Sequence, residues 1–244
     1  MKAAVVKKFS KKGEKIVNMN HEAITKGAEN INKIDVPADW KNAVEEKAAE
    51  KDVPAYVKNI LDPCNAQAGD KLPVSTFMGM VDGHLEQGMA AYEKRGIAVD
   101  VPEWDVTKCI QCNKCALVCP HAAIRPVVLN EEEVKAAPAS LTHKKMIGKG
   151  MEGYEFGIIV STLDCSGCGN CAKVCPAKES ALTMKPIATQ MDKQEAFDYG
   201  VKVSVKPELL TAPLNVKNSQ FRQPLLEFSG ACAGCGETPY AKLI

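Results

Sequence analysis

Two runs of four cysteines, each closed by a proline, are the residues of this sequence best suited to chemistry. Both runs have the spacing C-x2-C-x2-C-x3-C-P. Their members are Cys109, Cys112, Cys115, Cys119 and Pro120 in the first run, and Cys165, Cys168, Cys171, Cys175 and Pro176 in the second. Thiolates at this spacing are ligands of 4Fe–4S clusters. The sequence therefore predicts two iron–sulfur clusters, which accept and release single electrons.

The fourth cysteine of each run is expected to bind the cluster of the other run. Three closely spaced thiolates can hold one face of a cubane, whereas the fourth is carried away on the following helix. In two-cluster ferredoxins it ligates the other cluster. One predicted ligand set is therefore Cys109, Cys112, Cys115 and Cys175, and the other is Cys165, Cys168, Cys171 and Cys119. This crossing predicts that the two copies fold as one pseudo-twofold unit.

The residues between the cysteines fit the same chemistry. Gly167 and Gly169 permit a positive φ and a close approach of the backbone, so that amide N–H groups can point at cluster sulfur atoms. Pro120 and Pro176, which lack an N–H, end each run. Small apolar residues stand at matching places in the two copies and suit either contact with a cluster or a plain core. They are Ala116, Val118, Ala172 and Val174.

Other uses of the cysteines remain as alternatives. Structural zinc joins two separated C-x2-C pairs through four ligands in total, a pattern that four closely spaced cysteines and a proline do not match. A non-redox zinc-binding module, a redox dithiol and a ferredoxin-like relay subunit of another oxidoreductase are the competing hypotheses. The sequence contains no phosphate-binding loop, dinucleotide fingerprint or nucleophile elbow. We therefore expect electron transfer and no catalytic residues.

Three cysteines and the four histidines lie outside these runs. Cys232 and Cys235 form a single C-x2-C pair in a glycine-rich setting, which suits half of a third cluster site, a dithiol or an incidental pair. Cys64 stands alone and is expected to be a structural thiol. The histidines show no metal-binding spacing, and His121 is expected at the surface rather than beside a cluster. The four are His21, His84, His121 and His143.

Composition and charge narrow the class of protein. The chain has 244 residues and 11 cysteines, which are clustered and odd in number, unlike the scattered pairs of a secreted disulfide scaffold. The net charge of +1 gives no indication of a nucleic acid or a membrane surface as partner. No apolar run of about 18 residues and no signal-peptide core are found. These features predict a reducing, cytoplasmic setting, in which thiolates are free to bind metal.

The predicted fold class is α+β: a two-cluster ferredoxin-like domain with an insertion, flanked by helical and extended linker segments. We expect helices over residues 20–34, with Asn20 as N-cap, and from Asp39 towards Lys51. Short β-prone runs predict strands at 123–126, 154–162 and 181–186, and the alternation of apolar and polar residues predicts one at 201–205. Residues 130–153 interrupt the repeat as an insertion, which begins with an acidic helical turn at 131–133.

Several segments together resemble a known family. They are residues 101–104, 109–115, 119–126, 164–171, 176–178 and 228–240, and the last has the sequence Phe-Ser-Gly-Ala-Cys-Ala-Gly-Cys-Gly-Glu-Thr-Pro-Tyr. With the long segment before Trp104, they resemble the pyruvate:ferredoxin (flavodoxin) oxidoreductases over essentially the whole chain. The cysteine runs alone are common to many enzymes, whereas the final motif is far more specific.

The resemblance implies that the chain is an interior fragment of such an oxidoreductase. It assigns 1–52 to the helical end of a preceding domain, 53–103 to an extended linker, 104–186 to the two-cluster domain, 187–228 to a second linker and 229–244 to the start of a thiamine-diphosphate-binding domain. It also implies that Cys232 and Cys235 are a half-site of a third 4Fe–4S cluster. Thiamine diphosphate and Mg would bind only in the full-length parent, a homodimer that converts pyruvate to acetyl-CoA and passes electrons to ferredoxin or flavodoxin.

Overall fold

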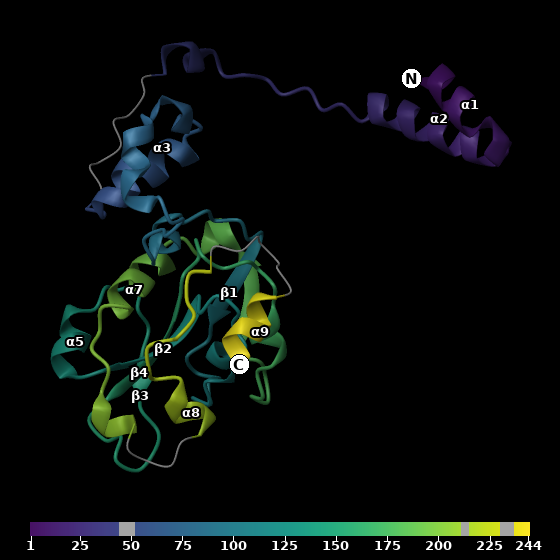
Figure 1. Ribbon diagram of the computed structural model, residues 1–244. Helices are drawn as coiled ribbons and strands as arrows, with labels where there is room; N and C mark the ends of the chain where they lie inside the picture. Colours follow the sequence, from purple (N-terminus) through teal and green to yellow (C-terminus); the bar gives the residue numbers. More distant parts are fainter. Residues whose placement is uncertain (44–51, 211–214, 230–236) are drawn as a thin grey trace. The chain divides into compact units, whose positions relative to one another are not determined.

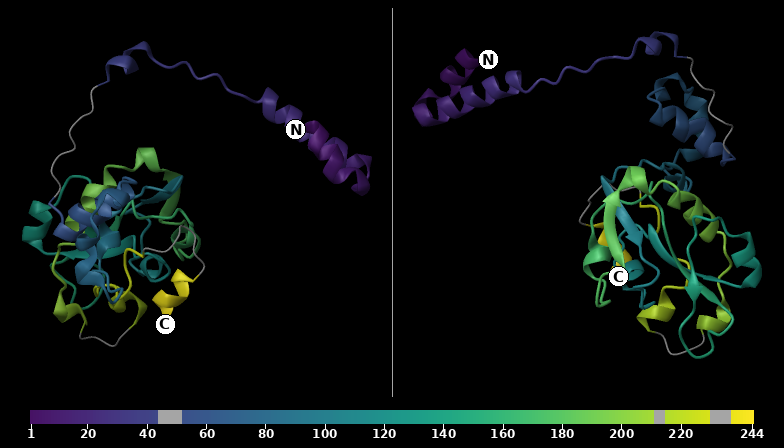
Figure 2. Two further views of the ribbon diagram at one scale, coloured as in Figure 1. Left: turned by 45° about the horizontal axis from the view of Figure 1, so that its top comes forward. Right: turned by 180° about the vertical axis from the view of Figure 1, so that it is seen from behind.

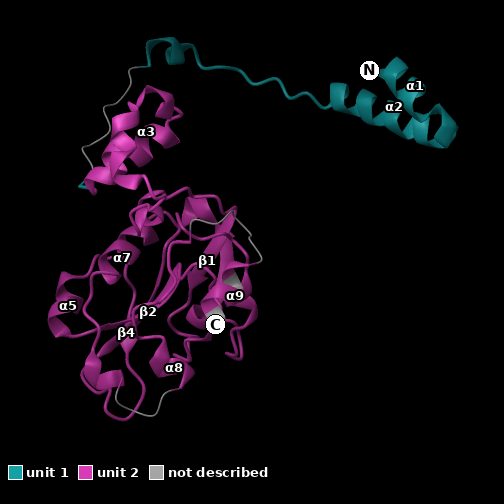
Figure 3. Ribbon diagram, viewed as in Figure 1, with its two compact units in different colours: residues 1–52 teal, residues 53–244 magenta. Residues whose placement is uncertain are grey.

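The computed structural model describes residues 1–43, 52–210, 215–229 and 237–244 (Figure 1). The chain divides into two compact units, Met1–Asp52 and Val53–Ile244 (Figure 3). Among the described residues, no helix is both long enough and apolar enough to cross a bilayer.

The first unit is helical. It contains α1 (Lys2–Phe9), α2 (Glu14–Glu29) and a 3₁₀ turn at Ala38–Asn42. The helix predicted over 20–34 is present but begins earlier, after Gly13, and ends at Glu29. Asn20 is not its N-cap, because its Nδ2 donates to the carbonyl of Ile16 at 2.7 Å inside the helix. The helix predicted from Asp39 is a short 3₁₀ turn at its start, and its remainder lies outside the described residues.

Residues 53–98 open the second unit with consecutive helical turns. A π-helical turn at Val57–Leu61 leads into α3 (Asp62–Asn65), and 3₁₀ turns follow at Gly69–Lys71, Val74–Met80 and Met89–Tyr92. The segment is therefore less extended than the sequence predicted. Few of its side chains are buried, which agrees with its lack of a regular apolar period.

Two antiparallel sheets carry the rest of the unit. In one, β1 (Asp100–Trp104) pairs with β5 (Leu182–Pro186), with Asp100 opposite Pro186. In the other, the order is β2-β4-β3, formed by β2 (Ile124–Leu129), β4 (Glu155–Val160) and β3 (Lys144–Lys145). The strand before each cysteine run thus pairs with the strand after the other run, as a pseudo-twofold unit requires. The paired β1 and β5 can be followed from behind in Figure 2.

Short helices connect these strands. The two helices inside the cysteine runs are α4 (Lys114–Leu117) and α6 (Asn170–Lys173). The helical turn predicted at 131–133 is confirmed as the start of α5 (Glu131–Ala136), which a capping box between Asn130 and Glu133 begins. Two more short helices follow the last strand and connect none, α8 (Val216–Ser219) and α9 (Thr238–Leu243).

The strand predicted at 201–205 is wrong. These residues form a turn that continues α7 (Lys193–Gly200), in which the N–H of Val203 donates to the carbonyl of Gly200 at 3.3 Å. The strands predicted near 123–126, 154–162 and 181–186 are confirmed as β2, β4 and β5. Alternation alone therefore did not distinguish a strand from a helix followed by turns at 201–205.

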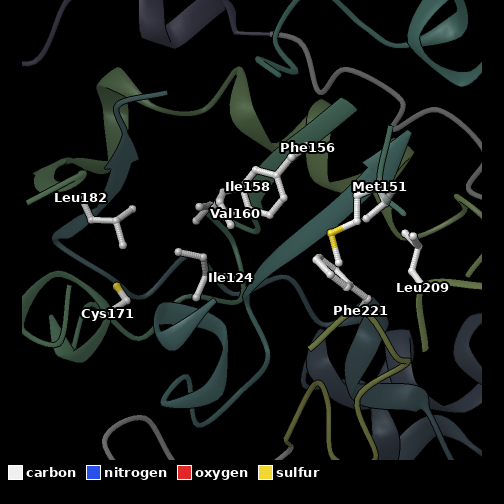
Figure 4. Close-up of a cluster of buried hydrophobic side chains, with 10 residues drawn as sticks. Ile124, Met151, Phe156, Ile158, Val160, Cys171, Leu182, Leu209 and Phe221 are labelled. Atoms are coloured by element: carbon white, nitrogen blue, oxygen red, sulfur yellow. The ribbon is translucent and has the colours of Figure 1, made fainter. Parts of the chain in front are cut away.

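Strands β2 and β4 are buried on both faces, because their alternate side chains enter two separate apolar clusters. The smaller cluster holds Val127, Leu129, Leu141, Ile159, Ala196 and Phe197. The larger one, shown in Figure 4, holds Ile124, Val128, Met151, Phe156, Ile158, Val160, Cys171, Leu182, Leu209 and Phe221. Cys109, Cys115 and Cys119 pack against this larger cluster. The core therefore fixes the cysteine runs in place.

Candidate metal centre

The eight cysteines of the two runs line two separate cavities. The first cavity is lined by Cys109, Cys112, Cys115 and Cys175, together with Trp104, Ile110, Asn113, Ile158, Ala181 and Leu182. The fourth cysteine of the second run thus lies with the first three cysteines of the first run. The reason is the strand pairing: the strand after each run pairs with the strand before the other run. This pairing brings the fourth cysteine of each run next to the first three of the other.

The second cavity contains the complementary set. Its cysteines are Cys119, Cys165, Cys168 and Cys171. His121 also lines this cavity and is only 8% exposed, so its expected place at the surface is wrong. It is buried because the turn after Pro120 folds inward onto the second cysteine loop.

Backbone amides point at cysteine sulfur atoms in both copies. The N–H groups of Gln111 and Gly167 donate to the sulfur two residues earlier, in each case at 3.4 Å. Ala181 N–H donates to the sulfur of Cys175 at 3.4 Å. Hydrogen bonds of this kind stabilise a thiolate and tune the reduction potential of iron–sulfur centres.

The two cysteine loops reach the same backbone conformation with different residues. Gly167 and Gly169 have φ of 70° and 72°, and the matching Gln111 and Asn113 have φ of 57° and 60°. Gln111 Nε2 donates to the carbonyl of Lys145, and Gln111 Oε1 accepts from the N–H of Ile147, both at 2.8 Å. The two hydrogen bonds of the buried Gln111 side chain offset the cost of its left-handed conformation. Sequence reasoning missed Gln111 and Asn113, although alignment of the two copies places them opposite the glycines.

We expect Gly167→Ala to destabilise the protein more than Gly169→Ala. A Cβ at position 167 would lie 3.0 Å from the carbonyl oxygen of Asp100 and 3.3 Å from the Cβ of Ala98, whereas one at position 169 meets nothing within 4 Å. Both carry the cost of a left-handed side chain, roughly 1–2 kcal/mol, and only Gly167→Ala adds the clash. Melting temperatures of the two variants test this, with Gly169→Asn as a mild control because Asn113 occupies the matching position. Equal losses would contradict the close approach.

Burial raises the pKa of three of these thiols, which makes them poorer acids. It raises the pKa of Cys165 to about 11 and that of Cys171 to about 12, and neighbouring thiols add to both shifts. Burial, with the charges of Cys109, Cys171 and Cys112, also raises the pKa of Cys115. Cys175 differs, because burial is outweighed by hydrogen bonds from Ala177, Ala181 and Ser180, which lower its pKa.

The donors of each cavity fit an iron–sulfur cluster. Four soft thiolate ligands converge from two loops, and amide donors stand behind them. Among the residues that the structure describes, no three Cys, His, Asp or Glu side chains gather closely enough to bind a single metal ion.

A lysine from the end of the chain reaches the first cysteine loop. Lys242, in α9, donates from Nζ to the carbonyl oxygens of Ala116 and Cys119, at 2.9 and 2.7 Å. It thereby fixes the turn that carries Cys119 towards the second cavity. No motif predicts this contact, because the partners are more than 120 positions apart.

Cys64 and His143, of the described residues, line neither cavity. Cys232 and Cys235 lie outside the described residues. Cys64 is an exposed free thiol, and Nδ1 of His143 lies 3.3 Å from a carboxylate oxygen of Glu155. Of the small apolar residues, Ala116 is buried and Ala172 packs against the larger apolar cluster.

Comparison with known families defines the class of the central domain. A family model described as a 4Fe-4S dicluster domain matches residues 108–179, which contain both cysteine runs. The match and the mixture of helices and strands show an α+β, ferredoxin-like domain. A second model, described as a domain of unknown function, matches residues 43–98.

Curated relatives match the chain over its whole length. A pyruvate-flavodoxin oxidoreductase of Enterobacter agglomerans is 50% identical over 247 residues, which are 100% of this chain and 20% of the relative. A pyruvate:ferredoxin oxidoreductase of Moorella thermoacetica is 50% identical over 245 residues, 100% of this chain and 21% of the relative. An NADP-dependent pyruvate dehydrogenase of Cryptosporidium parvum is 40% identical over 273 residues, which are 100% of this chain and 14% of the relative.

The chain is thus related over its full length to the pyruvate:ferredoxin and pyruvate-flavodoxin oxidoreductases, and the resemblance drawn from its motifs is confirmed. It spans about a fifth of the length of these relatives.

Proposed function

We propose that this chain passes electrons through two 4Fe–4S clusters, as part of an oxidoreductase that decarboxylates pyruvate oxidatively to acetyl-CoA. The observation that carries the proposal is the crossed grouping of cysteines: each cavity takes three thiols from one run and the fourth from the other. The 4Fe-4S dicluster match over 108–179 and the relatives' names support the same function.

In this proposal the chain's residues hold, tune and shield the clusters. Cys109, Cys112, Cys115 and Cys175 would bind the first cluster, and Cys165, Cys168, Cys171 and Cys119 the second. A bound cluster supplies one-electron redox chemistry. The amides of Gln111 and Gly167 would donate to ligand sulfur, and the larger apolar cluster would exclude water. The two sites are neighbours, because Cys171 belongs to the larger apolar cluster and Cys115 packs against it, and electrons would pass between them.

The proposal extends to the partners and cofactors of a larger protein. Ferredoxin or flavodoxin would accept the electrons, as the relatives' names indicate. Cys232 and Cys235 would supply half the ligands of a third cluster. The larger protein would also bind thiamine diphosphate and Mg, and it would be a homodimer. Within this chain, 104–186 would be the two-cluster domain, with 1–52, 53–103, 187–228 and 229–244 as the flanking parts named above. Iron-binding thiolates would be kept in a reducing compartment such as the cytoplasm.

Iron and acid-labile sulfide analysis of the anaerobically purified chain tests the proposal. Two 4Fe–4S clusters give about eight iron and about eight sulfide per chain, with coupled EPR signals after dithionite reduction. Cys64→Ser is the matched control, since this exposed thiol lines neither cavity, and it should keep the full content. About four iron, or zinc in place of iron, would overturn the two-cluster proposal.

A further inference from the structure

Residues 93–98 cross the loop that leads into the second cysteine run. The N–H of Gly96 donates to the carbonyl of Leu163 at 2.9 Å. Two residues further on, Ala98 lies close to Gly167. A Cβ added to Gly167 would be 3.3 Å from the Cβ of Ala98. The end of the segment that matches a domain of unknown function thus packs directly on a cysteine loop.

Within this crossing, Lys94 pairs with Asp164, the residue before Cys165. Lys94 Nζ donates to Asp164 Oδ2, and the side chain of Asp164 is only 9% exposed. Ser161 Oγ, which is buried, donates to the same oxygen at 2.5 Å. A carboxylate in such a place depends on its partners, since removal of the cation leaves a buried charge uncompensated.

Lys94 is itself held in position by two aromatic rings. Its Nζ lies 4.7 Å from the ring centroid of Phe228 and 5.6 Å from that of Phe197, at cation–π distance. Its backbone has a φ of 43°, an uncommon conformation for a lysine, which persists only when the surroundings enforce it. The ammonium group is therefore fixed in place, unlike that of a surface lysine.

We propose that Lys94 is a positioning residue for the second cysteine loop, and that by neutralising Asp164 it raises the reduction potential of the cluster bound by Cys119, Cys165, Cys168 and Cys171. This inference rests on the proposed function. Reduction adds negative charge to a cluster, and a bare carboxylate beside a ligand disfavours that step. Lys94 lies in the segment that matches the domain of unknown function. This segment would thus set the reduction potential of the second cluster and leave that of the first unaffected.

The test compares Lys94→Met with Arg95→Gln in the full chain. Both remove one positive charge from the same turn, but Arg95 pairs with Glu93 and not with Asp164. In an anaerobic EPR redox titration, Lys94→Met should lower the potential of one cluster by roughly 59 mV, the equivalent of a tenfold change for one electron. Arg95→Gln should shift it far less. The affected cluster should be the one whose signal Cys168→Ser alters.

Asp164→Asn provides the opposite change. It leaves Lys94 unopposed and should raise the same potential, whereas Lys94→Met combined with Asp164→Asn should return it near the wild-type value. A wild-type chain with two clusters whose potentials Lys94→Met leaves unchanged would overturn this inference and leave the proposed function intact. So would equal shifts of both clusters.

Hydrogen exchange in the full chain tests the positioning separately. The N–H of Cys165 donates to the carbonyl of Ser161 at 3.1 Å, in the loop that the Lys94–Asp164 pair holds. This amide should exchange faster in Lys94→Met than in Arg95→Gln. Equal exchange rates in the two variants would overturn the positioning role. Absence of clusters from the wild-type chain is a separate outcome, and it would overturn the proposed function.

Discussion

Replacement of Cys119 by serine is expected to damage the cluster of the second cysteine run and to spare that of the first run. Cys119 belongs to the first run in sequence but lines the cavity of Cys165, Cys168 and Cys171. A serine oxygen is a poor substitute for a soft thiolate on iron. The iron content should fall from about eight towards about four per chain, as measured by anaerobic iron analysis.

EPR spectra of paired variants show which cluster is lost. Cys119→Ser should remove the same signal as Cys168→Ser. Conversely, Cys175→Ser should remove the same signal as Cys112→Ser, since these two cysteines line the other cavity. Cys64→Ser should remove neither. If Cys119→Ser instead matches Cys112→Ser, each run binds its own cluster and the crossed assignment is wrong.

Removal of the clusters is expected to cost the second unit a large part of its stability. Cys171 is a member of the larger apolar cluster, and Cys109, Cys115 and Cys119 pack against it. Without iron, that side of the core borders on two cavities lined by thiols. A ligand present at 1,000 times its dissociation constant stabilises by about 4 kcal/mol, which corresponds to on the order of 10 °C in melting temperature for a unit of this size.

Circular dichroism melting before and after anaerobic chelation measures this loss. Reconstitution with iron and sulfide should restore the original melting temperature, which distinguishes cluster loss from irreversible damage. Zinc added in place of iron and sulfide is the matched control and should restore little. A melting temperature that chelation leaves within a few degrees of the starting value would mean that the apolar core holds the cysteine loops without metal.

The sequence predicted those parts of the site that local spacing determines. Cysteine spacing follows from the ligand geometry of a cubane, so both ligand sets could be proposed from the repeat alone. Strand β4 was recognised because β-branched and aromatic residues follow one another from Glu155 to Val160. Helix α2 was found but misplaced, because Asn20 resembles an N-cap and is instead bonded within the helix.

The remaining features depend on contacts between distant residues. Lys94 and Asp164 are 70 positions apart, and Asn113 donates to the carbonyl of Lys217 across 104 positions. No periodicity or motif links such pairs. His121 was expected at the surface for the same reason, since its burial depends on the loop that contains Cys165. The Lys94 and Lys217 contacts join the paired copies to segments that precede and follow them, and the repeat carries no information about those segments.

The exchange of strands between the two copies also bears on the ancestry of the domain. A single copy would leave each strand without its partner and each cavity one thiol short, so a one-copy ancestor would have had to work as a symmetric pair of identical chains. Fusion of the two copies then needed only the link that is now the insertion between β2 and β4. Because β1 and β5 lie side by side, the fused domain begins and ends at one place, and such a module can be inserted into a longer host protein without separating the segments on either side.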